Sequence, residues 1–326
     1  MGLSISEKAI IIMLAGFFGT ALLGLIVVPI LKKLKIGQVV RTDGPQSHLK
    51  KSGTPTMGGI IMLLVLLAIS VVLSIKSPDL SHKLIPVTLV TLGYGVIGFI
   101  DDFKKLILKN PKGLSPSLKL LGLIIVAVSF MVYLLNSGYG TETYIPFLKE
   151  YITVPNWLFI ASGVFIILAC TNSLNLTDGL DGLAASVTTV IMIFFACIAM
   201  ISNVLSLTLF SAAVVGCTLG FLLFNGYPAR VFMGDTGSLA LGGAFCSVAI
   251  MLKMPLILVV VAGVCVIEAI SVILQVIYFK VTHGKRLFKM APIHHHLELS
   301  GMKETSIVVL FTVITIVLAW FSFLIV

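Results

Sequence analysis

The sequence predicts an all-α polytopic membrane protein, built as a single domain over residues 1–326, and three observations support this fold class. Hydrophobic residues make up 58% of the chain and charged residues only 11%, whereas soluble domains carry roughly 25% charged residues. The mean hydropathy is +1.15. The apolar stretches are continuous and reach roughly the 20 residues that a bilayer-spanning helix needs, and they do not alternate as barrel strands do. A soluble protein, a disordered chain and a transmembrane barrel are therefore excluded.

Hydropathy and chain-breaking residues together predict about ten transmembrane helices, since backbone groups in lipid must bond within their own helix. We expect them near residues 6–31, 57–75, 84–101, 118–136, 157–172, 183–201, 205–223, 236–252, 256–280 and 305–326. Between the fourth and fifth of these, residues 137–156 hold glycines and prolines, which favour a small external hairpin or an irregular loop. An even number of helices places both termini on one side of the membrane.

Loop charges predict which side that is. The loops that follow the odd-numbered helices, with the helix ends beside them, hold 17 of the 22 Lys and Arg residues. By the positive-inside rule those loops are cytoplasmic and both termini lie outside. Contact with anionic lipid head groups explains part of this basic surplus, and the remainder suits a polyanionic substrate; no nucleic-acid partner is expected. The five cysteines lie in or at the ends of apolar segments without a CxxC pair, so we expect neither a disulfide framework nor a metal site from them.

The third predicted helix closes with two adjacent carboxylates, Asp101 and Asp102, in the motif GFIDDFKK. Buried in lipid they would be costly, so we expect them at the water boundary. Lys105 lies four residues after Asp101, on the same helix face, where it could screen that carboxylate or hold a phosphate. A solvated helix end with an ion pair is the simpler alternative for this motif taken alone.

Two more loops on the same predicted side are dense in side-chain oxygens. The first reads TNSLNLTDGLDGLA and has more Asn, Asp and Gly residues than a plain connector needs. The second reads FNGYPARVFMGDTGS and places Asp235 just before the eighth helix. A helix N-terminus binds phosphate readily, and an acid beside it can hold Mg²⁺ that bridges phosphate oxygens. A simple helix cap is the alternative for Asp235.

The last cytoplasmic loop carries three consecutive histidines, His294, His295 and His296. Consecutive positions do not suit a helical zinc site, and no fourth ligand stands at a familiar spacing. Phosphate contact or general acid–base catalysis fits them better. Together the four motifs gather hard oxygen ligands and basic residues at the helix ends of one leaflet, which indicates Mg²⁺-assisted phosphoryl chemistry at the membrane surface.

The same motifs carry a resemblance over the full chain, in order. They are KKSGTPTMGG (50–59), DDFKK (101–105), NSLNLTDGLDGLA (172–184), FNGYPARVFMGDTGS (224–238) and APIHHHLE (291–298). The sequence resembles the bacterial phospho-N-acetylmuramoyl-pentapeptide-transferase family, within the polyprenyl-phosphate N-acetylhexosamine-1-phosphate transferase superfamily. The motifs DDFKK and NSLNLTDGLDGLA are shared with sister families that use other sugar nucleotides, and the triple histidine after Ala-Pro singles out the muramoyl branch.

The resemblance implies a ten-helix transferase domain, usually a homodimer, in the bacterial cytoplasmic membrane. Its reaction would move phospho-MurNAc-pentapeptide from UDP-MurNAc-pentapeptide to undecaprenyl phosphate, giving lipid I and UMP with Mg²⁺ as cofactor. By motif position, Asp235 would be the metal ligand, Asp101 and Asp102 the catalytic pair, and His294 a further catalytic residue. The implied substrate-binding residues are Lys51, Thr56, Asn172, Asn175, Asp178, Gly179, Leu180, Asp181, Asn225, Phe232 and His295, with Phe232 stacked on uracil.

Three alternatives stay open at this point. The lipid phosphate could attack the substrate directly, or the reaction could pass through a covalent phospho-aspartyl intermediate. A sister transferase acting on UDP-GlcNAc is the nearest other function. A transporter is a more distant one, supported only by the number of helices and by Glu268 inside the ninth; a transport path needs polar residues through the membrane depth, whereas here they gather at one surface.

Overall fold

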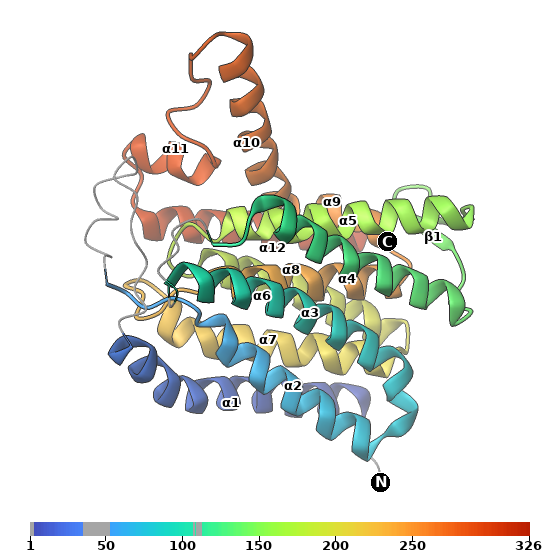
Figure 1. Cartoon of the computed structure of the whole chain (residues 1–326). Coiled ribbons are helices and arrows are strands. Elements are labelled where there is room, and N and C mark those ends of the chain that lie inside the picture. The colour runs from blue at the N-terminus through green and yellow to red at the C-terminus, as the bar shows by residue number, and fades with distance from the viewer. Residues whose placement is uncertain (1–2, 35–52, 107, 109–112) are drawn as a thin grey trace.

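The computed structural model describes residues 3–34, 53–106, 108 and 113–326, and in these residues it is almost entirely helical (Figure 1). The long helices are α1 (Ile5–Lys33), α2 (Gly59–Lys76), α3 (Ser81–Leu106), α4 (Pro116–Asn136), α5 (Asn156–Thr177), α6 (Leu183–Ile201), α7 (Leu205–Asn225), α8 (Gly234–Met251), α10 (Gly263–Val281) and α12 (Glu304–Ile325). The shorter elements are the helices η2 (Pro78–Leu80), η3 (Pro255–Ile257), α9 (Leu258–Val261) and α11 (Ile293–Leu299), and the strands β1 (Glu142–Ile145) and β2 (Glu150–Thr153).

Nine helical segments in the described part of the chain are long and apolar enough to cross a membrane, which confirms a multi-pass membrane protein. The helix α8 is not among them. Every residue of α8 from Thr236 to Met251 is buried within the protein, so it has no need of the hydropathy that a lipid-facing helix requires. The helix α8 nevertheless runs the length of the bundle. Asp235, near its start, bonds to Lys119 at one end, and Lys253, two residues after its last residue, bonds to Glu142 of β1 at the other.

The predicted segment 137–156 forms a hairpin at one end of the bundle. Its strands pair antiparallel, with Tyr144 opposite Tyr151. The backbone N–H of Tyr144 donates to the carbonyl of Lys253 at 2.7 Å, and its hydroxyl donates to the carbonyl of Val326 at 2.8 Å. Figure 1 shows both chain termini at this end, away from α11. Which side of the membrane this end faces stays a prediction from the loop charges.

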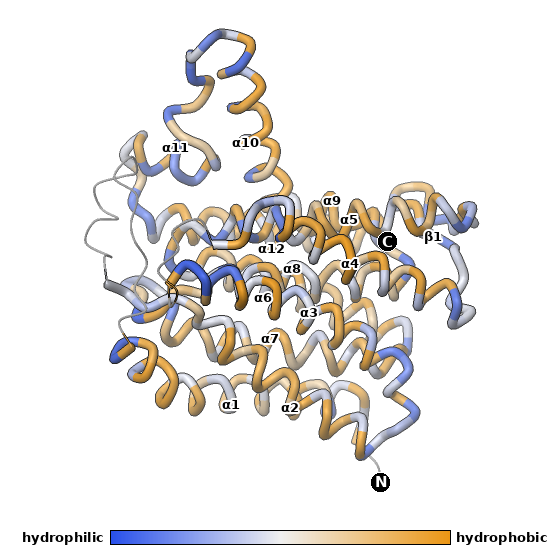
Figure 2. Tube along the Cα trace, in the orientation of Figure 1, coloured by the Kyte–Doolittle hydropathy of each residue, from blue (hydrophilic) through white to orange (hydrophobic). Residues whose placement is uncertain are grey.

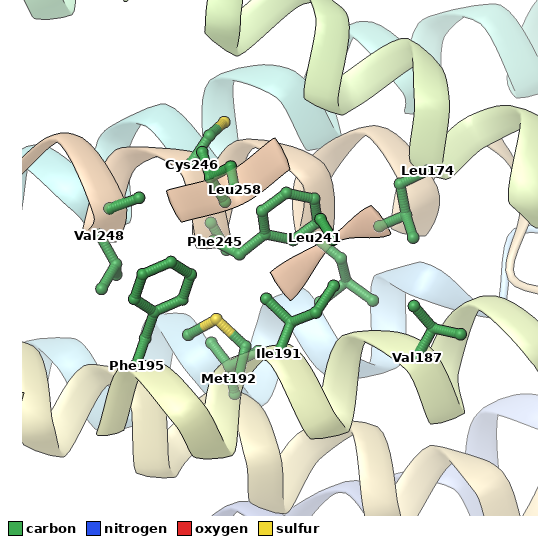
Figure 3. Packing of buried hydrophobic residues seen from close by; sticks show 14 of the residues in the cluster. Leu174, Val187, Ile191, Met192, Phe195, Leu241, Phe245, Cys246, Val248 and Leu258 are labelled. Atoms are coloured by element: carbon green, nitrogen blue, oxygen red, sulfur yellow. The ribbon is translucent and has the colours of Figure 1, made fainter. Parts of the chain in front are cut away.

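The buried hydrophobic cluster takes in residues of most of the long helices, and Figure 3 shows the part of it where α5, α6 and α8 meet. Ile191, Met192 and Phe195 of α6 point toward Leu241 and Phe245 of α8. Figure 2 shows hydrophobic residues along the helices and hydrophilic ones concentrated near the helix ends. Side chains of the outer helices, such as α1 and α12, remain exposed and apolar, as lipid-facing surfaces are.

Small residues allow the helices to approach closely. A Cβ atom added at Gly216 of α7 would lie 2.0 Å from the carbonyl oxygen of Met13 in α1. Because such a contact is impossible for any larger residue, the α1–α7 packing depends on this glycine, as is common between helices in membranes.

Two features of the C-terminal third differ from the sequence prediction. The single helix expected over 256–280 is broken into η3, α9 and α10. The break falls at Ala262 and Gly263, and from there α10 leaves the bundle (Figure 1). The triple histidine, expected in a loop, lies on the short helix α11, which begins directly after Pro292. Hydropathy alone could not reveal either feature, because both depend on local backbone geometry within residues of suitable composition.

Candidate active site

The described parts of the predicted motifs lie together at the bundle end opposite the hairpin. Asp101 and Asp102 lie in the last two turns of α3, and Asp235 lies in the first turn of α8. The side chain of Asp101 is 3% exposed and that of Asp235 is 18% exposed. The two carboxylates come from segments more than a hundred residues apart, so their meeting is a property of the fold.

Two lysines bridge these carboxylates. The Nζ atom of Lys119, in the first turn of α4, lies 2.7 Å from Oδ2 of Asp235 and 3.2 Å from Oδ2 of Asp101. The Nζ atom of Lys105 lies 3.1 Å from the same oxygen of Asp235 and 2.8 Å from that of Asp101. The predicted pairing of Lys105 with Asp101 is therefore confirmed. Each ammonium group links α3 to α8, and charge-assisted contacts of this kind are among the strongest that side chains make.

Asp102 has a different task, because it caps α8. Its Oδ2 atom accepts the backbone N–H of Thr236 at 2.9 Å and the hydroxyl of Thr236 at 2.7 Å. Its Oδ1 atom accepts the backbone N–H of Asp235 at 3.3 Å. A carboxylate at a helix N-terminus satisfies free N–H groups and complements the helix dipole. Both oxygens of Asp102 thus hold the backbone that carries Asp235.

Two glycines permit this close approach. A Cβ atom added at Gly98 of α3 would lie 2.1 Å from the carbonyl oxygen of Asp235. Gly234 has φ = +73°, a left-handed conformation that favours glycine, and a Cβ atom there would lie 2.6 Å from Oδ2 of Asp102. The glycine before Asp235 is therefore needed so that Asp102 can approach and cap the start of α8.

The two asparagines of α5 behave differently. The amide of Asn175 donates to Oδ1 of Asp235 and to the hydroxyl of Ser238, both at 2.8 Å, so Asn175 belongs to the cluster. Asn172 is exposed, and its amide donates to the carbonyl of Leu168 in its own helix. The structure thus joins Asn175, and not Asn172, to the carboxylates by a hydrogen bond.

Asp178, just after α5, lies near the same charges. Burial, followed by the charges of Asp235 and Asp102 and then that of Asp181, raises the pKa of Asp178 well above its usual value. This crowding shows that carboxylates are in excess at this end of the bundle, although Lys105 and Lys119 offset part of their charge.

The loops after α5 and α7 are tied to each other. The side-chain oxygen of Asn225 accepts the backbone N–H of Gly182 at 3.1 Å, and its amide donates to the carbonyl of Val231 at 3.0 Å. Oδ2 of Asp181 accepts the backbone N–H of Ala229 at 2.9 Å. Both side chains are buried, and their hydrogen bonds fix the positions of the two loops.

The segment before α2 lies against this assembly. The backbone N–H of Phe232 donates to the carbonyl of Pro55 at 2.8 Å, and its carbonyl accepts from Gly58 at 2.9 Å. These bonds place buried Thr56 beside Gly234, whose added Cβ atom would lie 2.9 Å from the Thr56 hydroxyl. Phe232 is half-buried and Leu180 is buried. Lys51, also predicted to bind substrate, lies outside the described residues.

The three histidines of α11 face three partners. Nδ1 of His294 lies 3.0 Å from Oε1 of Glu268 in α10. Nδ1 of His295 lies 2.9 Å from Oε2 of Glu298, and Nδ1 of His296 accepts the backbone N–H of Lys289 at 3.1 Å. This divergence agrees with the prediction that the histidines do not share one metal. His294 nevertheless reaches the site, because a Cβ atom added at neighbouring Gly179 would lie 2.2 Å from its Nε2.

The donor set fits Mg²⁺, a hard cation that prefers carboxylate oxygens and retains water ligands. Asp101, Asp102 and Asp235 outnumber the two lysines that face them. Of the three carboxylates, that of Asp235 is the one an ion from solution can reach. The side chain of Asp101 is almost fully buried, and the oxygens of Asp102 already accept the hydrogen bonds of the α8 cap. No group of three His, Cys, Asp or Glu residues in the described ranges is arranged to hold a metal ion without further ligands.

Sequence reasoning missed Lys119 and Thr236. Lys119 lies at the start of the predicted helix 118–136, where a lysine can reach water, so nothing in the sequence showed that it would pair with Asp101 and Asp235. Thr236 follows Asp235 directly, but nothing in the sequence shows that its donors serve Asp102 rather than solvent.

Comparisons with known proteins agree with this arrangement. Residues 84–253, which contain most of α3 and all of α5 and α8, match the family model described as Glycosyl transferase family 4. The chain is 49% identical to a phospho-N-acetylmuramoyl-pentapeptide-transferase of Acetivibrio thermocellus, over 96% of the chain and 94% of that relative. It is 48% identical to the enzyme of the same name from Caldanaerobacter subterraneus, over 97% and 98%, and 45% identical to that of Bacillus subtilis, over 94% of each.

Proposed function

We infer the chemistry of this site from the premise that the chain belongs to glycosyl transferase family 4 and, within it, to the phospho-N-acetylmuramoyl-pentapeptide-transferases. It is a transferase of peptidoglycan synthesis that moves phospho-MurNAc-pentapeptide from UDP-MurNAc-pentapeptide to undecaprenyl phosphate. The products are lipid I and UMP. The structural observation that carries this proposal is the bridging of Asp101 and Asp235 by Lys105 and Lys119.

The nucleotide half of the substrate fits the loops beside the cluster. Loop 178–182 and loop 226–233 are fixed to each other by Asn225 and Asp181, and half-buried Phe232 offers a ring on which uracil can stack. We propose that the diphosphate lies between these loops and Asp235. Lys105 and Lys119 then bind its oxygens, because ammonium groups engaged with carboxylates are equally suited to phosphate.

The reacting groups follow from this placement. A phosphate oxygen of undecaprenyl phosphate attacks the phosphorus that is bonded to the sugar oxygen. The bond from that phosphorus to the bridging oxygen breaks, and UMP leaves with the electron pair. We propose that Asp101 positions the lipid phosphate through Lys105 and Lys119, which it holds, whereas Asp102 positions Asp235 through the α8 cap. Asp235 would hold Mg²⁺, which supplies positive charge to the diphosphate as it cleaves.

Direct attack and a covalent phospho-aspartyl route predict different exchange reactions. A covalent route requires labelled UMP to enter UDP-MurNAc-pentapeptide in the absence of undecaprenyl phosphate. We propose direct attack, since Asp101 is 3% exposed at its side chain and paired with two lysines, which leaves it poorly placed as a free nucleophile. Exchange without the lipid would contradict this choice.

The turnover assay that tests the function uses purified protein in lipid nanodiscs with both substrates. The wild type is expected to release UMP and form lipid I with Mg²⁺ and to lose activity with EDTA. Asp235→Asn is expected to lower kcat by about 10³-fold, because it removes the carboxylate that would hold Mg²⁺. Equal turnover of UDP-GlcNAc would favour the sister activity, and Mg²⁺-independent turnover would contradict the role of Asp235.

Two further parts of the proposal concern the surroundings of the chain. We propose that it works in the bacterial cytoplasmic membrane with the carboxylate end facing the cytoplasm, where UDP-sugars are made. We also propose a homodimer, for which cross-linking in native membranes is the test.

A further inference from the structure

A buried carboxylate and a buried histidine meet at the edge of the site. Glu268 lies in the first half of α10 and His294 in the first turn of α11. Both residues are 0% exposed, and Oε1 of Glu268 lies 3.0 Å from Nδ1 of His294. Glu268 stands in a helix apolar enough to cross a membrane, where an ionisable residue is costly unless it has a function and a partner.

The opposite edge of the imidazole of His294 faces loop 178–182, which lies between α5 and α6. Nε2 of His294 is so close to Gly179 that a Cβ atom there would lie 2.2 Å away. Gly179 follows Asp178 in the loop that also carries Asp181. One ring nitrogen therefore faces Glu268 and the other faces the loop beside the carboxylate cluster.

The pair also has unused hydrogen-bonding capacity. Both ring nitrogens and both Glu268 oxygens lack a hydrogen-bond partner among the described residues, although Nδ1 and Oε1 are only 3.0 Å apart. Buried polar atoms without partners are rare in native proteins, and each one calls for an explanation.

We propose that Glu268 is a positioning residue for His294, holding the proton on Nδ1 and presenting Nε2 to the diphosphate–sugar region of the bound UDP substrate. A carboxylate beside one imidazole nitrogen fixes the tautomer and the orientation of the other. The inference rests on the proposed transferase function. It also explains why one acid persists within an otherwise apolar stretch of α10.

Kinetics of four variants test this proposal. Glu268→Gln keeps the size of the side chain and removes its charge, so we expect kcat to fall about 10- to 100-fold, the usual cost of losing such a partner. We expect the KM for UDP-MurNAc-pentapeptide to stay within about threefold. Glu268→Asp, which keeps the charge, should restore most of kcat. Ser271→Ala is the matched control, since Ser271 is buried one turn later in α10 and its hydroxyl donates to the Glu268 backbone carbonyl.

The decisive comparison is a double-mutant cycle. If Glu268 acts through His294, Glu268→Gln should lower kcat by less than about threefold in a His294→Gln background. Losses that multiply in the double variant would overturn the proposal, as would wild-type kcat in Glu268→Gln or an equal loss in Ser271→Ala. Should Glu268→Gln fail to fold, Glu268→Met, which also removes the carboxylate and suits an apolar helix, gives the same comparison in the two backgrounds. Absence of lipid I formation by the wild type would instead refute the transferase function itself.

Discussion

Two acid–lysine pairs lie at opposite ends of the bundle, and their surroundings differ far more than their contacts do. At the hairpin end, Nζ of Lys253 lies 2.5 Å from Oε2 of Glu142, and the two side chains are 32% and 41% exposed. At the other end, Lys119 and Asp235 are 2.7 Å apart and 21% and 18% exposed. Both contacts close an ion pair between distant segments of the chain.

The difference lies in what each acid touches besides its lysine. Glu142 has one cation beside it, whereas Asp235 also bonds to Lys105 and Asn175 and sits on a backbone held by Asp102. A partly exposed single ion pair adds little to the stability of a protein. A partly buried network of charges instead creates a strong electrostatic potential for a charged ligand that binds there. The comparison teaches that charge crowding and helix-end geometry, rather than an ion pair as such, distinguish the active end.

Among the substitutions considered, replacing Asp101 should lower activity most at the carboxylate end, while the matched change at the hairpin end should have no effect. We expect Asp101→Asn to lower kcat by about 10³-fold, because Lys105 and Lys119 lose the carboxylate that holds them toward the reacting phosphates. The matched substitution at the hairpin end, Glu142→Gln, should leave kcat unchanged. UMP release in nanodiscs measures both, and similar activities for the two variants would contradict the assignment of the site.

The lysines sharpen the comparison. Lys119→Ala should lower kcat about 10²-fold, since Lys119 is the less exposed of the two lysines that we assign to the transferring phosphate. A rise in KM without a change in kcat would show instead that Lys119 contributes only to binding the ground state.

A substitution at the α3–α8 contact tests the position of α8 without removing any polar group, and we expect a smaller loss of activity from it. Gly98→Ala puts a methyl group against the carbonyl of Asp235 and should displace the start of α8, lowering kcat about 10- to 100-fold. Gly93→Ala, on the same helix, meets only the side chain of Val126, which can move. Equal activity of these two variants would show that the position of α8 is not critical.

The hairpin end should show the smallest effect. The double variant Glu142→Gln, Lys253→Ala removes its ion pair, and we expect kcat within about twofold of the wild type, as for exposed pairs elsewhere. Thermal unfolding checks that the fold is retained. A large loss of activity would mean that the two ends are coupled.

Much of the fold was predictable because hydropathy reports on lipid contact. The predicted helix at 183–201 has the bounds of α6, and 205–223 lies within α7. The break at Ala262 and the short helix α11 were not predictable, since apolar composition is the same in a straight helix and a broken one. The buried helix α8 was found from its breakers, and its isolation from lipid became visible only in the fold.

The candidate site was predictable in its members but not in their roles. Asp101, Asp102 and Asp235 share one residue type, yet one pairs with lysines, one caps a helix and one faces both lysines and Asn175. Such roles depend on distances across the fold, which motif spacing does not encode. Asn172 repeats the residue type of Asn175 one turn earlier and bonds only to its own helix in the contacts described here.

The most direct test of the site is binding of a divalent ion, followed by the electron paramagnetic resonance of Mn²⁺ with Mg²⁺ as competitor. The wild type and Glu142→Gln should bind Mn²⁺ with equal affinity, and Asp235→Asn should weaken binding at least about tenfold, because it removes the accessible carboxylate. Unchanged Mn²⁺ affinity in Asp235→Asn would contradict the central role assigned to this end of the bundle.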